Sequence, residues 1–142
     1  MAAPLTVVRQ RTFNGTKRRI FQLLSDMGTS NDSVWPFASQ PFMRSPGPLT
    51  PGRTEEWHIG FHSILDEVVP EDRIVWRIQN DGVSGTHGFY VGGDEAKKTT
   101  VIHRIDAELS EPEGRMFWRR VEDAYERSTE GLFDKIARVL KR

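Results

Sequence analysis

The sequence contains no cysteine, which excludes disulfides, thiolate zinc sites and a cysteine nucleophile. No apolar run approaches the ~18 residues that a membrane-spanning helix requires, and the first residues lack the charged and apolar regions of a signal peptide. Basic and acidic residues number 20 each, and zero net charge argues against general electrostatic binding of nucleic acid. We therefore expect a cytoplasmic protein with no nucleic-acid partner and no membrane span.

Motifs that announce common enzyme classes are also missing. The sequence has no GxSxG, no P-loop and no dinucleotide fingerprint, so we predict no cofactor. No internal repeat is visible, and 142 residues are about the length of one domain. We therefore treat residues 1–142 as a single domain.

Residues 115–141 dominate the chain. They contain no proline, and most of their apolar side chains recur at intervals of three, four or seven residues. That spacing puts them on one stripe of an α-helix, which at ~1.5 Å per residue would be about 40 Å long. The rest of the chain is mostly strand-like. We predict an α+β fold in which a curved antiparallel sheet wraps around this long C-terminal helix.

The elements before this helix follow from local patterns. A first strand is expected at residues 5–13, followed by a short helix that Thr16 caps. Residues 36–52 hold five of the eight prolines and form a long connection, which is typical of lids and of plain surface loops alike. Alternating apolar side chains predict the later strands, at residues 53–59, 62–69, 74–78, 87–91 and 101–109.

Three segments in this order resemble the START-like (SRPBCC) helix-grip superfamily, which is often described as polyketide cyclase/dehydrase and lipid transport. They are residues 20–26 (IFQLLSD), residues 64–76 (ILDEVVPEDRIVW) and the terminal helix. The resemblance implies a sheet that grips the helix and leaves a cavity for an apolar ligand. It implies no catalytic residue, because the superfamily has no universal catalytic motif.

Two predicted turns set the register of three strands. A two-residue turn at Asp81-Gly82 places Trp76 opposite His87, and a hairpin centred on Glu95 places His87 opposite His103. Directly opposed residues share a face. We therefore expect Trp76, His87 and His103 in a row that faces the helix.

The strand before this row should add an acidic residue. A turn of two or four residues after that strand places Glu67 opposite Trp76, whereas a three-residue turn places Asp66 there. We prefer Glu67, because its register keeps the strand's apolar side chains inside. The two histidines then have three roles open to them, in the core, in ligand binding, or in proton transfer with Glu67 or Asp66.

A second constellation contains Glu56, His58 and His62. A three-residue loop around Gly60 would place the two histidines opposite each other, which suggests metal ligands. The spacing is unlike the helical HExxH of zinc enzymes and no cysteine adds to it. We therefore predict no metal site.

The sequence favours binding of a small hydrophobic or aromatic ligand between sheet and helix. One alternative is an enzyme of the polyketide cyclase or dehydratase type in the same cavity. Another is a chaperone-associated protein-interaction module, which a very small cavity and an exposed apolar patch would favour. The sequence leaves homodimer formation open. The expected ligand-binding residues are Trp76, His87, Phe89, His103, Ile105, Trp118 and Tyr125.

Overall fold

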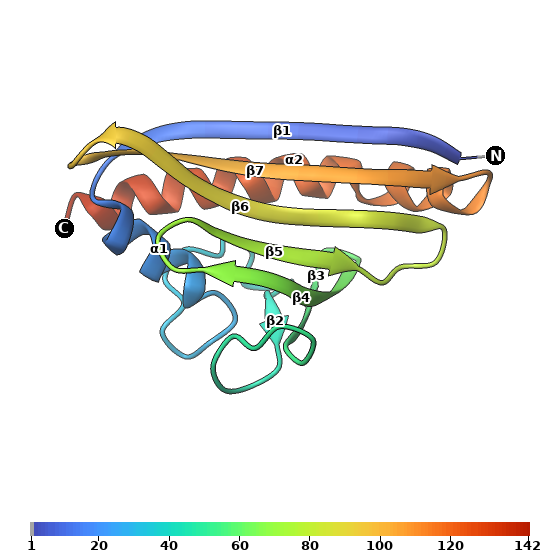
Figure 1. Ribbon diagram of the computed structural model, residues 1–142, viewed down its shortest axis with the longest axis horizontal. Helices are drawn as coiled ribbons and strands as arrows, with labels where there is room; N and C mark the ends of the chain where they lie inside the picture. The colour runs from blue at the N-terminus through green and yellow to red at the C-terminus, as the bar shows by residue number, and fades with distance from the viewer. Residues whose placement is uncertain (1) are drawn as a thin grey trace.

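The computed structural model describes residues 2–142. A seven-stranded antiparallel sheet lies against the long helix α2, and the short helix α1 lies near one end of that sheet (Figure 1). Across the sheet the strand order is β1-β7-β6-β5-β4-β3-β2. The elements are β1 (Ala2–Asn14), α1 (Lys17–Ser25), β2 (Met43–Arg44), β3 (Glu55–His58), β4 (Phe61–Val69), β5 (Arg73–Ile78), β6 (Val83–Glu95), β7 (Lys98–Ser110) and α2 (Glu113–Leu140).

The predicted fold class is confirmed. Helix α2 begins two residues before and ends one residue before the predicted range. Thr16 caps α1 as expected, because its side chain accepts a hydrogen bond from the Arg19 backbone N–H at 3.1 Å. Within residues 2–142, neither helix has the length and apolar character needed to cross a bilayer.

The core divides along α2 into two clusters. Towards its C-terminal end, Leu132, Phe133, Ile136 and Val139 pack with α1 and the inner face of the sheet. Towards its N-terminal end, α2 packs against the other end of the sheet. The stripe on α2 thus builds both clusters. The second cluster contains Phe61, Ile78, Ile105, Phe117, Val121 and Tyr125.

The first of the two predicted registers is confirmed. Trp76 pairs with His87, and Ile74 pairs with Phe89. The second register is wrong by two residues, because His87 pairs with Ile105 and His103 pairs with Phe89. The turn closes between Glu95 and Lys98, and the ladder is irregular between Gly92 and Glu95. A shift of two residues preserves the face of every side chain.

The predicted position of Glu67 is also wrong. Leu65 pairs with Trp76, and an irregularity in the ladder lies between Leu65 and Glu67. The extra residue of a bulge reverses the alternation beyond it, so Glu67 pairs with Val75 instead. Asp66 does not oppose Trp76 either.

Candidate functional site

A small cavity lies between the sheet and α2, close to the middle of that helix. The space available to the centre of a water molecule within it is about 20 Å³, enough for about one water. We call it the central cavity. Its wall consists of Met27, Trp35, Phe42, His58, His87, Phe89, His103, Tyr125, Ser128, Thr129 and Leu132.

Glu56 links two histidines of this wall. Its Oε1 lies 3.0 Å from His87 Nε2, and its Oε2 contacts His58 Nδ1. Glu56 and His58 are two residues apart on β3, so they share the inner face. Ser63 pairs with Glu56 from β4, and its Oγ lies 3.0 Å from His87 Nε2. Curvature of the sheet therefore brings β3 and β4 side chains to a residue of β6.

Glu56 is a carboxylate in this setting. Burial alone would raise its pKa, because the charged form loses its hydration, but His58 and His87 hold the pKa at about 2. Burial lowers the pKa of His87, although Glu56 opposes that shift. We conclude that neutral His87 donates its Nε2 proton to Glu56. The Nδ1 atom of His87 is buried and has no hydrogen-bond partner among residues 2–142.

A second polar pair joins the sheet to α2. The Tyr125 hydroxyl and His103 Nδ1 lie 2.8 Å apart, and both side chains are buried. Burial, followed by the nearby His87 and His58, holds the pKa of His103 well below its usual value. Burial also raises the pKa of Tyr125 to about 12. Both groups are therefore neutral near pH 7.

The structure brings together four of the predicted ligand-binding residues, namely His87, Phe89, His103 and Tyr125. The rings of His87 and His103 lie 5.5 Å apart on one face, although the two residues are not register partners.

The other three predicted residues do not line the central cavity. Trp76 is buried and borders a separate, smaller space beside Leu24 and Ile74. Ile105 is in the second core cluster, and Trp118 packs against that cluster from its half-buried position. These three side chains therefore support the wall without forming it.

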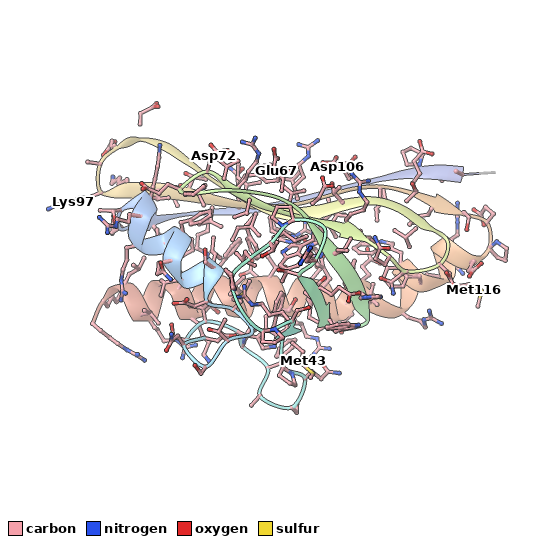
Figure 2. The ribbon with its side chains drawn as sticks, turned by 60° about the horizontal axis from the view of Figure 1, so that its bottom comes forward. Met43, Glu67, Asp72, Lys97, Asp106 and Met116 are labelled. Carbon is pink, nitrogen blue, oxygen red and sulfur yellow. The ribbon has the colours of Figure 1, made fainter. Side chains whose placement is uncertain are left out.

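Glu67 is remote from the histidines. Figure 2 shows it with Asp72 and Asp106 on the side of the sheet that faces away from α2. It forms a salt bridge with Arg73 at 2.6 Å, and its pKa is lowered by the hydrogen bond from that residue. Asp66 likewise pairs with Arg77 at 3.1 Å. Neither carboxylate is placed to exchange a proton with His87 or His103.

The acidic partner of the histidines is instead Glu56, which the sequence had suggested only beside His58 and His62. The hairpin loop between β3 and β4 is two residues long, so His58 pairs with Phe61 and His62 pairs with Trp57. This one-residue difference moves His62 to the other face. There it contacts Glu55 at 2.8 Å.

Other wall residues gave little signal in the sequence. Trp35 and Phe42 belong to the connection between α1 and β2, where no periodicity indicates which side chains point inwards. Ser128 and Thr129 are polar positions on the buried face of α2. Both hydroxyls donate a hydrogen bond to the Tyr125 carbonyl at 2.9 Å, so each already has a hydrogen-bond partner within the helix.

An exposed apolar patch lies at the β2 edge of the sheet. Met43 and Trp57 are register partners, and they remain 58 % and 42 % exposed. Their neighbours border an open surface groove, which includes Pro41, Ile59 and His62. His58 borders both this groove and the central cavity, so the patch adjoins the polar network.

The buried network can accept or deliver a proton as well as hold a polar group. A neutral imidazole with a carboxylate partner has the composition of a general base. The cavity beside it is walled mainly by aromatic and aliphatic side chains, so a molecule there would be shielded from bulk water. The geometry thus combines apolar walls with one unpartnered nitrogen.

Comparison with known proteins places the fold. No family model matches the chain, and no curated protein matches it. The chain is similar to solved structures at low sequence identity. Protein Ms6760 from Mycobacterium smegmatis has a TM-score of 0.68 at 14% identity, over 96% of this chain and 91% of that one.

Two further structures agree. A START superfamily protein from Mycobacterium smegmatis has a TM-score of 0.57 at 15% identity, over 94% of this chain and 98% of that one. CalU16 from Micromonospora echinospora has a TM-score of 0.62 at 14% identity, over 89% of this chain and 71% of that one. The chain therefore has the START-like helix-grip fold.

Proposed function

We propose that this chain binds a small aromatic or hydrophobic molecule that carries one polar group, in the central cavity between the sheet and α2. The observation that carries the proposal is His87 Nδ1, a buried nitrogen without a hydrogen-bond partner in a wall of aromatic side chains. An unmet buried polar atom costs roughly 1–3 kcal/mol. Because the Nε2 proton of His87 is donated to Glu56, Nδ1 is an acceptor, and a ligand hydroxyl that donates to it would remove this cost.

Entry of such a ligand requires the cavity to enlarge, because ligand pockets are usually about 300–1,000 Å³. Trp35 and Phe42 are the wall residues that would have to move, since they come from the connection between α1 and β2 and not from the sheet or a helix. The Trp35 ring lies 5.6 Å from Phe42 and 5.5 Å from His58. Displacement of these two rings would open the space in front of His58 and His87 without breaking the sheet.

The test compares p-cresol with toluene, which differ by one hydroxyl group. We expect both to bind in calorimetric titration and p-cresol to bind about 5- to 10-fold more tightly, because it gains one buried hydrogen bond. Hydrogen exchange should slow in the connection between α1 and β2 when p-cresol binds. Native mass spectrometry of freshly purified protein would reveal any retained natural ligand.

Two substitutions on α2 provide the matched control. Ser128→Leu fills the cavity from a buried position and should abolish binding of both probes. Glu122→Leu adds the same side chain at an exposed position of the same helix and should leave binding unchanged. Equal affinity of p-cresol and toluene would show that His87 Nδ1 does not bind the hydroxyl group. Binding of neither probe would overturn the proposal.

A second candidate function is binding of another protein. The small volume of the central cavity and the exposed Met43 and Trp57 favour it. Trp57→Ser should then abolish capture of that partner from a cell extract and leave p-cresol binding intact. Loss of p-cresol binding in Trp57→Ser would show that the patch and the cavity are not independent.

A further inference from the structure

We infer that Glu56, His58 and His87 form a binding site for one divalent transition-metal ion of the zinc type. One ligand atom from each residue lies within 4.8 Å of the others. The ligand set combines two imidazoles with one carboxylate, which zinc accepts in catalytic sites. This set shares Glu56 and His58 with the one that the sequence suggested and has His87 in place of His62.

The spacing of the ligand atoms suits a tetrahedral ion. With bonds of about 2.1 Å, ligand atoms around such an ion are roughly 3.4 Å apart. Glu56 Oε1 and His87 Nε2 are 3.0 Å apart, and Glu56 Oε2 contacts His58 Nδ1. An ion that replaced the shared protons would separate these two pairs slightly, and the two imidazole nitrogens already lie within 4.8 Å of each other. The Ser63 hydroxyl is the other polar group beside that nitrogen, with its Oγ 3.0 Å from His87 Nε2.

The buried negative charge of Glu56 also favours binding of a cation. The Glu56 side chain is 0 % exposed and the His87 side chain 3 %. Among residues 2–142, the histidines His58 and His87 contact the Glu56 carboxylate, and no lysine or arginine forms a salt bridge with it. A buried carboxylate is costly unless a positive partner balances it. A metal dication would supply that balance from the side where both imidazoles already point.

The unpartnered nitrogen of His87 is the second, independent observation. If Nε2 binds the ion, the ring must carry its proton on Nδ1, which lies buried without a partner. Metal-bound histidines donate this second N–H to an oxygen atom. His87 and His58 both line the central cavity, so an oxygen of a bound molecule or of one water could accept it. This inference does not depend on the proposed ligand binding, because the three metal ligands come from the chain itself.

The experiment uses the full chain after removal of metals with EDTA. We expect one Zn²⁺ or Co²⁺ to bind per chain in calorimetric titration, and bound Co²⁺ to show the intense visible absorption of tetrahedral coordination. Mg²⁺ at the same concentration should not bind, because imidazole ligands disfavour it. Zn²⁺ should also raise the melting temperature, which a weakly bound surface ion would not do.

Single substitutions identify the ligands. Glu56→Gln, His58→Gln and His87→Gln should each weaken Co²⁺ binding by about 100-fold or more. His62→Gln is the control, because His62 lies on the other face of the hairpin beside Glu55. If one of the three ligand variants fails to fold, the other two and the wild-type Co²⁺ spectrum still test the site. An octahedral Co²⁺ spectrum, or equal weakening in His62→Gln, would overturn the site.

Discussion

Glu56 on β3 and His87 on β6 are 31 residues apart in the sequence, yet Oε1 of one lies 3.0 Å from Nε2 of the other in the interior. Two whole strands, β4 and β5, separate them in the sheet. The contact therefore exists only because the sheet curves strongly around α2. The two histidines beside Glu56 hold it in its ionised state, whereas burial keeps His87 neutral against the opposing effect of Glu56, and several measurable properties follow.

Acid should destabilise the protein through Glu56. Its pKa is about 2 in the folded state against 4.5 for an unperturbed glutamate. Because the unfolded chain takes up the proton first, stability is present above pH 4.5 and is lost as the pH falls towards 2. The shift corresponds to about 3 kcal/mol. Urea unfolding at pH 7, 4.5 and 3, in EDTA, should show this loss in Glu55→Gln and much less of it in Glu56→Gln.

His103 should cause a loss of stability at a higher pH than the loss caused by Glu56. Its folded pKa is well below 6.5, chiefly through burial, then through His87 and His58, with Glu56 acting in the opposite direction. The unfolded chain therefore binds this proton first, so the free energy of unfolding falls as the pH drops below about 6.5. We expect His103→Gln to flatten the pH dependence between 7 and 5. A variant with the full wild-type slope would show that His103 is not buried in a neutral form.

Removal of the Tyr125 hydroxyl should destabilise the contact between α2 and β7. Tyr125→Phe leaves His103 Nδ1 without its partner at 2.8 Å, which costs about 1–3 kcal/mol. Tyr90→Phe is the control, since Tyr90 is half-buried and its hydroxyl has no side-chain partner within residues 2–142. Denaturant unfolding should separate the two variants. Equal stability of both would mean that the Tyr125–His103 bond contributes nothing net.

Gly114 should not tolerate a methyl group, although it lies in the first turn of α2. Alanine favours a helix over glycine by about 1 kcal/mol, but a Cβ at Gly114 would lie 2.1 Å from the Gly82 carbonyl oxygen. The backbones must separate to relieve that overlap, so we expect Gly114→Ala to lower the free energy of unfolding by about 1–3 kcal/mol. Gly92→Ala adds a methyl with no atom within 4 Å. A thermal melt in which Gly114→Ala is the more stable variant would contradict this packing.

The sequence by itself determined the elements whose signals are local. The apolar stripe of α2 follows from helical periodicity, the start of α1 from the Thr16 side chain, and the Trp76–His87 pairing from the Asp81-Gly82 turn. In each case a few neighbouring residues contain the whole physical cause. The fold class follows from these elements, because a long amphipathic helix and successive hairpins have few ways to bury their apolar faces.

Which residues form the site was determined only by the tertiary structure. The ladder irregularity after Leu65 turned Glu67 outwards, and the two-residue loop after His58 separated it from His62. Each is a one-residue effect, and one residue exchanges the two faces of a strand. The two-residue error at His103 was harmless for the same reason. Bulges and curvature depend on packing between distant strands, so no local pattern could have placed Glu56 against His87.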